Sequence, residues 1–162
     1  MRLTQHTDYA IRVLMFAASL WDSGRLASIR EIAEAFGVSE NHLMKVVHRL
    51  GQAGFLQTVR GRNGGLRLAR EPARIRIGEV VRGIEEDFSL VECFTDRSTC
   101  PLTGACGLAR ALDRAKAAFI GELDRYTLAD VVPQSRARQI VALRGALAQR
   151  IPASGAGRTR GV

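Results

Sequence analysis

The sequence predicts a mainly α-helical fold: a winged helix–turn–helix domain with a β-hairpin wing, followed by a long C-terminal dimerisation helix. Three patterns predict it. A short helix, a glycine turn and a second helix follow one another within residues 28–53. Two β-capable segments flank an Asn-Gly pair within residues 55–68. An apolar stripe with helical spacing then runs from residue 107 to about residue 130.

The composition is that of an ordinary globular protein, with 46% hydrophobic and 25% charged residues in 162. This length suits one small domain with a helical appendage. No segment reaches the length of apolar sequence that spans a membrane, and the N-terminus lacks the apolar region of a signal peptide. We therefore expect a cytoplasmic protein that does not contact a membrane.

The net charge of +8 is unevenly distributed. Residues 1–84 carry a net +6, residues 85–130 a net −4, and residues 131–162 a net +6. A basic N-terminal part favours a polyanionic partner such as double-stranded DNA, although many basic proteins bind no nucleic acid. The predicted organisation is a DNA-binding domain (1–86), a cysteine loop (87–106), a dimerisation helix (107–132) and a basic, partly disordered tail (133–162).

Helical spacing and capping residues place the elements of the first domain. The first helix is expected over residues 8–21, with Thr7 or Asp8 at its N-terminus. Ser28 and Glu31 form a capping-box pattern that starts the second helix, and Gly37 ends it. Ser39 caps a third helix over residues 40–53, and a fourth is expected over residues 77–86.

The third helix has the pattern of a recognition helix. Leu43, Val46, Val47 and Leu50 share one apolar face, which we expect to be buried. Lysine, arginine, histidine and asparagine on the other faces can address phosphates and base edges, although any surface helix carries a polar face. The candidate DNA-binding residues, with those of the helix caps and the hairpin, are Ser28, Ser39, Asn41, His42, Lys45, His48, Arg49, Arg60, Arg62, Asn63 and Gly64.

The hairpin directly follows the helix–turn–helix, which is the position of a wing. Asn63-Gly64 supplies the backbone conformation of a tight hairpin turn, and Arg60 and Arg62 lie near its tip. A basic wing can contact the DNA backbone or minor groove. A structural hairpin with solvent-facing arginines is the alternative.

The long C-terminal helix carries an apolar stripe that the small preceding domain cannot cover fully. The stripe is expected to join two copies of the chain in a homodimer. Packing against the first and fourth helices of the same chain is the alternative. Pro133 ends the helix, and a further short helix is expected around residues 140–147. The dimerisation residues are Leu108, Leu112, Ala115, Phe119, Leu123 and Tyr126.

The only cysteines of the chain, Cys93, Cys100 and Cys106, fall within 14 residues of a segment that contains Pro101 and Gly104. The spacing of these cysteines is less typical of a zinc site, because zinc sites usually use closer cysteine pairs. A Cys–His enzyme is not expected, because all three histidines lie in the DNA-binding part. An iron–sulfur cluster suits soft thiolates at wider spacing. A cluster is favoured over zinc and over buried structural cysteine.

A cluster held within one subunit needs a fourth ligand, which is not a cysteine here. Glu85, Glu92 and Asp96 are the candidates nearby in sequence. Asp8 and His6 are candidates only if the first helix approaches the loop. For Asp8 the alternative is a favourable interaction with the dipole of that helix.

Several segments together resemble the NsrR family of nitric-oxide-sensing repressors, in the winged-helix group that also contains the iron–sulfur regulator IscR. The resemblance covers about residues 1–132 and rests on LTQHTDYAIRVL, SIREIAEAFGVSENHLMKVVHRL, GFLQTVRGRNGGLRLA, IRIGEVVR, the cysteine loop and LDRYTLADVV.

The resemblance implies a homodimer that binds a roughly palindromic operator and represses genes of nitric oxide detoxification. It implies cluster ligation by Cys93, Cys100 and Cys106, with Asp8 as the non-cysteine ligand to the partner subunit's cluster. A 4Fe–4S cluster is favoured and a 2Fe–2S cluster is possible. Ala109 stands where IscR-like proteins have a ligand histidine, which favours NsrR. The six-residue gap after Cys93 is one longer than is common in the group.

Three rival functions are weighed against this one. A redox or cluster-carrier enzyme would need an acid–base pair or a phosphate loop, and the sequence offers neither. A regulator of cluster assembly like IscR would differ in the promoters it occupies. A regulator that senses oxidants directly with its thiols would contain no iron.

Overall fold

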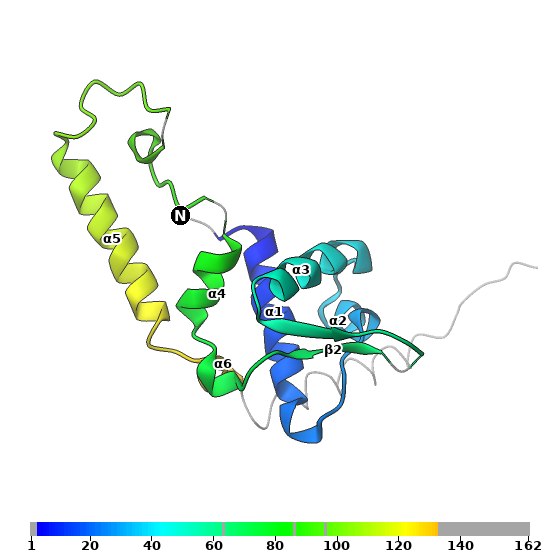
Figure 1. Cartoon of the computed structure of the whole chain (residues 1–162). Helices are drawn as coiled ribbons and strands as arrows, with labels where there is room; N and C mark the ends of the chain where they lie inside the picture. The colour runs from blue at the N-terminus through cyan, green and yellow to red at the C-terminus, as the bar shows by residue number, and fades with distance from the viewer. Residues whose placement is uncertain (1–2, 63, 86, 96, 133–162) are drawn as a thin grey trace, which may run out of the picture.

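The computed structural model describes residues 3–62, 64–85, 87–95 and 97–132 (Figure 1). Helices, 3-10 helices (η) and strands follow one another as α1 (Gln5–Ser19), η1 (Trp21–Ser23), α2 (Ile29–Phe36), α3 (Glu40–Gln52), β1 (Leu56–Val59), β2 (Gly65–Leu68), η2 (Pro72–Arg74), α4 (Ile77–Ile84), η3 (Glu92–Phe94), α5 (Gly107–Leu123) and α6 (Leu128–Val131). The predicted mainly α-helical fold with one hairpin is confirmed.

The first helix begins earlier than the sequence predicted. Thr4 is its N-cap and accepts a 3.3 Å hydrogen bond from the Thr7 N–H, whereas Thr7 and Asp8 lie inside the first turn. The prediction was wrong because Thr7 is buried and its hydroxyl binds Glu85 instead of capping the helix. The helix ends at Ser19, and a short 3-10 turn follows up to Gly24.

The helix–turn–helix forms as predicted. Both hydrogen bonds of the Ser28–Glu31 capping box are present at the start of α2. Gly37 ends α2 with φ 65°, a left-handed conformation that is easy for glycine. Ser39 accepts a hydrogen bond from the His42 N–H and caps α3.

The hairpin pairs β1 with β2 in antiparallel register, but its turn differs from the prediction. Val59 pairs with Gly65, so residues 60–64 connect the strands instead of a two-residue Asn-Gly turn. The Gly64 N–H donates to the Gly61 carbonyl at 2.9 Å, and Gly61 has φ 117°. Asn63 lies outside the described residues. The backbone of Ala27 bonds to Leu66 and extends the hairpin by one bridge.

The hydrophobic core lies between α1, the helix–turn–helix, the hairpin and α4. Leu14, Ile32, Leu50 and Val80 in this core are fully buried. The side chains on the predicted inward faces of α3 and α4 are buried there as well. α4 ends at Ile84, two residues before its predicted end, and Glu85 follows in extended conformation. This core fixes α3 with its polar side outward.

The long C-terminal helix is shorter than predicted and is followed by a separate short helix. α5 ends at Leu123, and Thr127 and Asp130 form a capping box that starts α6. The apolar spacing continues across this break because Leu128 returns to the core at 0% exposure. Tyr126 therefore lies between the two helices. Pro133, the expected helix around residues 140–147 and the basic tail lie outside the described residues.

Candidate nucleic-acid interface and metal centre

The exposed side of α3 presents the predicted polar side chains. Asn41, His42, Lys45 and His48 are exposed, and Arg49 is half-buried. Met44, which the sequence analysis did not select, is 49% exposed on the same helix. A large apolar side chain at this place can contact a thymine methyl group in a major groove. Its position away from the apolar face of the helical wheel was the available signal.

The two serine caps are already engaged with the protein backbone. Ser28 Oγ accepts from the Glu31 N–H at 3.1 Å, and Ser39 Oγ accepts from the His42 N–H at 3.3 Å. Each hydroxyl proton can still donate to a phosphate oxygen. Both predicted residues therefore position helices first, and a DNA contact would come in addition.

The wing places Arg60 and Arg62 exposed at its tip. Gly64 has a structural reason for its identity, because a Cβ there would lie 2.3 Å from the Val59 carbonyl oxygen. The close approach of the two backbones supports a compact tip that carries two cations.

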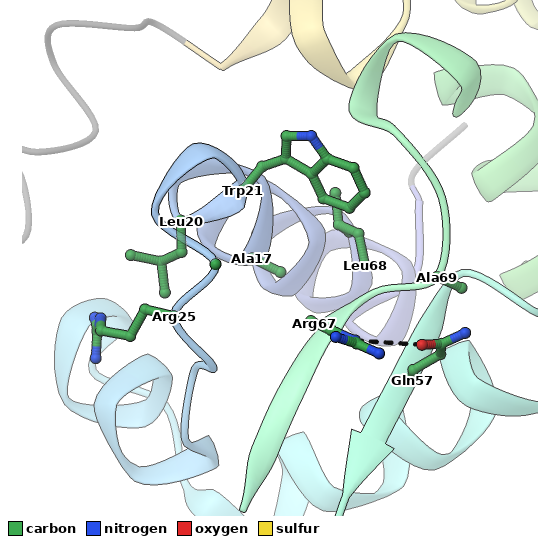
Figure 2. Close-up of a pocket in the computed structure, with 9 residues that line it drawn as sticks. Ala17, Leu20, Trp21, Arg25, Gln57, Arg67, Leu68 and Ala69 are labelled. Atoms are coloured by element: carbon green, nitrogen blue, oxygen red, sulfur yellow. Dashed lines mark hydrogen bonds between the residues drawn. The ribbon is translucent and has the colours of Figure 1, made fainter.

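An open cleft of about 340 Å³ lies where the end of α1 meets the wing (Figure 2). Trp21, Leu20 and Leu68 supply apolar side chains to its lining. Both lining arginines have partners: Arg67 Nε donates to Gln57 Oε1 at 3.3 Å, and Arg25 pairs with Glu31 at 2.6 Å. The sequence analysis did not predict this cleft.

The three cysteines lie in the loop between α4 and α5. Cys93 is in η3, Cys106 is the N-cap of α5, and all three are free and half-buried. Lys116 of α5 lies 4.9 Å from the ring centre of Phe94, which holds η3 beside the helix. Within the described ranges, no three His, Cys, Asp or Glu side chains converge as a metal site. The structure thus places the thiols in one loop without joining them around a common centre.

Glu92 fastens the loop onto itself. Its Oε1 accepts from both the N–H and the hydroxyl of Thr99, each at 2.9 Å. These hydrogen bonds hold the pKa of Glu92 below its usual range. Since Glu92 adjoins Cys93 and Thr99 adjoins Cys100, the bond draws the first two cysteine positions toward each other. This carboxylate, a candidate fourth ligand, has a structural role here.

The donor set of the loop fits an iron–sulfur cluster. Three free thiols supply the soft ligands that iron–sulfur clusters use. Cys106 also lies at the N-terminus of a 17-residue helix, where the helix dipole favours negative charge such as that of a thiolate-bound cluster. Asp96, a further predicted ligand, lies outside the described residues.

Asp8 and Glu85, two fourth-ligand candidates outside the loop, are both engaged at the start of α1. Asp8 forms an ion pair with Arg12, with Arg12 Nη2 2.8 Å from Oδ2 and Nε 3.1 Å from Oδ1. Glu85 Oε2 accepts from the Thr7 hydroxyl at 2.6 Å and from the N–H and hydroxyl of Thr4 at 3.1 Å.

His6 borders a different pocket. Its Nε2 is a buried atom that has no hydrogen-bond partner within the described part of the chain. It lines a small pocket between α1 and α3 together with Tyr9, His42 and Lys45. His6 is therefore directed toward the recognition helix rather than toward the cysteine loop.

The predicted dimerisation stripe is accessible in the single chain. Leu108 is 65% and Tyr126 46% exposed, Ala115 is exposed, and no described residue of α5 is buried. Leu112, Phe119 and Leu123 are half-buried. Packing within one subunit therefore leaves much of this apolar surface in contact with solvent.

Comparison with known proteins identifies the family. The profile of Rrf2, described as an iron-dependent transcriptional regulator, matches residues 3–134. The chain belongs to the Rrf2 family. It is 50% identical over 133 residues to the transcriptional regulator NsrR of Bacillus subtilis, a match that covers 82% of this chain and 90% of the relative. The NsrR of Geobacillus kaustophilus is 52% identical over the same length.

Solved structures of regulators share the Rrf2 fold. The global cysteine regulator CymR of B. subtilis matches with a TM-score of 0.66 and 28% identity, over 82% of this chain and 96% of that one. IscR of T. potens matches with a TM-score of 0.62 and 27% identity, over 96% and 94%.

The predicted winged-helix fold, the relation to NsrR and the assignment as a DNA-binding transcriptional repressor rather than an enzyme are confirmed. No described helix is long and apolar enough to cross a membrane.

Proposed function

We propose that this chain is a cytoplasmic homodimeric repressor of genes of nitric oxide detoxification, which senses nitric oxide through an iron–sulfur cluster on Cys93, Cys100 and Cys106. The observation that carries the proposal is the presence of three free, half-buried thiols in one loop, in a chain 50% identical to an NsrR. A reducing cytoplasm keeps such thiols available for metal. The bound cluster would supply iron that reacts with nitric oxide.

The fourth ligand in this proposal is Asp8 of the partner subunit. Its side chain is 47% exposed in the first turn of α1, so it is accessible to a second copy of the chain. Arg12 is the group that Asp8 would leave on binding iron and to which it would return. Arg12 itself remains supported by the rings of Tyr9 and Phe36, about 6 Å away. A 4Fe–4S cluster is favoured and a 2Fe–2S cluster remains possible.

DNA binding is assigned to α3 and the wing. Asn41, His42 and Lys45 are exposed where a recognition helix meets a major groove, and Arg60 and Arg62 extend the cationic surface. In a dimer joined through α5, two such units would contact a palindromic operator with half-sites about one helical turn, roughly 34 Å, apart.

The link between loop and recognition helix runs through α1. The buried carboxylate of Glu85, two residues before the cysteine loop, holds the first turn of α1 through Thr4 and Thr7. α1 in turn packs against α3. We infer that a change in the position of the loop would reach the DNA-binding helix through these hydrogen-bonded and packed contacts.

The test is operator binding by protein purified without oxygen, measured before and after one addition of nitric oxide. We expect at least a hundredfold loss of affinity, which corresponds to about 2.7 kcal/mol. The matched control is Cys106→Ser protein, whose operator affinity nitric oxide should not change. Unchanged affinity of the native protein would contradict the proposal.

The same preparations separate the alternative functions. An iron-free protein that loses its operator on oxidation would be a thiol sensor. A cluster-bearing protein that ignores nitric oxide and occupies promoters of cluster-assembly genes would act like IscR.

A further inference from the structure

The C-terminal end of α5 is where this helix joins the rest of the protein. Ile120 and Leu123 pack against the core, whereas Leu108 near the other end is 65% exposed. α5 packs against α4, and Figure 1 shows its N-terminal part extending beyond α4 toward the cysteine loop. The direction of α5 relative to the DNA-binding domain is therefore determined at its C-terminal junction.

Backbone hydrogen bonds anchor the chain immediately after α5. The Ile77 N–H donates to the Tyr126 carbonyl at 2.9 Å, and the Leu128 N–H donates to the Ile75 carbonyl at 2.7 Å. Leu128 is fully buried in the core. Because these bonds involve the main chain, they hold the segment whatever the neighbouring side chains are. They form a pivot about which α5 could still turn.

Asp124, the C-cap of α5, is fixed beside this pivot by two arginines. Arg82 Nη1 lies 2.8 Å from Oδ2 and Nη2 lies 2.8 Å from Oδ1, so the guanidinium holds both carboxylate oxygens. Arg76 Nη1 donates to the Asp124 carbonyl at 2.6 Å. A bidentate pair restricts orientation as well as distance. It therefore limits rotation of α5 about the pivot.

Gly78 makes room for this carboxylate. A Cβ at position 78 would lie 2.3 Å from Asp124 Oδ1 and 3.0 Å from the Asp124 nitrogen. Glycine is otherwise unfavourable inside a helix, and Gly78 is the second residue of α4. The close approach of α5 to α4 therefore depends on the absence of a side chain here.

We propose that Arg82, Asp124 and Gly78 set the angle between α5 and the DNA-binding domain, and thereby the operator half-site spacing that the dimer selects. This inference rests on the dimeric operator binding of the proposed function. The 17 residues of α5 span about 25 Å. A tilt of roughly 10° over that length moves the far end by about 4 Å, close to the rise of one base pair, about 3.4 Å.

A purely stabilising role explains these contacts less well. The side chains of Arg82 and Asp124 are 48% and 32% exposed, and ion pairs so exposed contribute little to stability. The hydrogen bonds from Arg82 hold the pKa of Asp124 below its usual range. The bidentate pair of Arg82 and Asp124, packed over Gly78, is better suited to control the orientation of α5.

The experiment uses an operator selected with the native full-length protein from random duplex DNA. Its spacer is then shortened or lengthened by one and two base pairs. We expect the native protein to lose roughly tenfold in affinity for a one-base-pair change. Asp124→Asn and Arg82→Lys should each lose less than about threefold in affinity for the same change of spacer, with unchanged affinity for a single half-site. For Arg82→Lys the reason is that Lys cannot hold both carboxylate oxygens.

Two further variants make the result decisive. Gly78→Ala, which displaces Asp124 while leaving both charges, should weaken the spacing preference in the same way. Glu122→Gln removes a charge from the neighbouring exposed pair with Arg125 and should leave the preference unchanged. Native-like spacing preference in all three junction variants would overturn the inference. If the native protein itself selected no two-site operator, the proposed function would fail first.

Discussion

Thr7 Oγ1 donates a 2.6 Å hydrogen bond to Glu85 Oε2 and so joins the first turn of α1 to the end of α4. The two residues are 78 positions apart in the sequence and both are buried. The same carboxylate oxygen accepts from Thr4, so one buried acceptor holds three donors of the α1 N-terminus. This cluster connects the start of the cysteine loop to the helix that packs against α3.

Removing the Thr7 hydroxyl tests the strength of this connection. Thr7→Val keeps the shape of the side chain and takes away one bond to a buried carboxylate. We expect a loss of about 1.5–3 kcal/mol in the free energy of unfolding, measured by urea denaturation. Ser19→Ala, which loses a half-buried hydroxyl bond to a carbonyl of the same helix, is the control and should cost less. Equal losses of unfolding free energy in the two variants would mean that the bond to Glu85 stabilises the fold no more than an ordinary hydroxyl–carbonyl bond.

Asp8 and Arg12 separate a ligand role from a helix-stabilising role. Either substitution, Asp8→Ala or Arg12→Ala, breaks their ion pair. Only Asp8→Ala should alter the visible absorbance of the cluster-bearing protein, because only Asp8 offers an oxygen ligand. Identical spectra for both variants and the native protein would leave Asp8 as a residue of the first helical turn, where an acid favourably meets the helix dipole.

Acid should weaken the helix–turn–helix through Glu31. Burial raises the pKa of Glu31, but hydrogen bonds from Ser28 and the pairing with Arg25 outweigh it and lower the pKa overall. Since the folded pKa is below the unfolded value of about 4.3, the stabilisation is complete above about pH 5 and is lost as the pH falls through the folded pKa. Glu31→Gln should flatten the fall of the urea midpoint below pH 5. An unchanged slope would contradict this assignment.

Substitution on the exposed stripe of α5 tests dimerisation. Leu108→Glu should shift the protein from dimer to monomer in sedimentation velocity, because it places a charge where two apolar stripes would meet. Ala117→Glu adds the same charge on the opposite side of α5, where the residue is also exposed, and should leave the dimer intact. A monomeric native protein, or dissociation by both variants, would count against this interface.

Local signals in the sequence were sufficient to predict most helices of the DNA-binding domain and their ends. The Ser28–Glu31 capping box, Gly37 and Ser39 each act over three or four residues, so their outcome did not depend on the rest of the fold. The helix ends that were wrong depended on distant partners. α1 begins before Thr7 because Glu85 binds that hydroxyl, and α5 ends before Tyr126 because Leu128 enters the core.

The candidate sites show the same difference between features that local sequence predicts and features that depend on hydrogen-bond partners. Exposure of Asn41, Lys45 and Arg62 followed from helical and hairpin periodicity. The engagement of Glu92 with Thr99 and of Glu85 with Thr4 could not be read from spacing, because carboxylates near cysteines look alike as potential ligands until their hydrogen bonds are known. Ligation of iron by the three cysteines and Asp8 stays a prediction.

The most direct test of this account is the iron and acid-labile sulfide content of protein purified without oxygen from iron-replete cells. We expect both elements in the native protein, and their loss in each of Cys93→Ser, Cys100→Ser and Cys106→Ser. A native protein that is folded, binds operator DNA and yet contains neither iron nor sulfide would contradict the account.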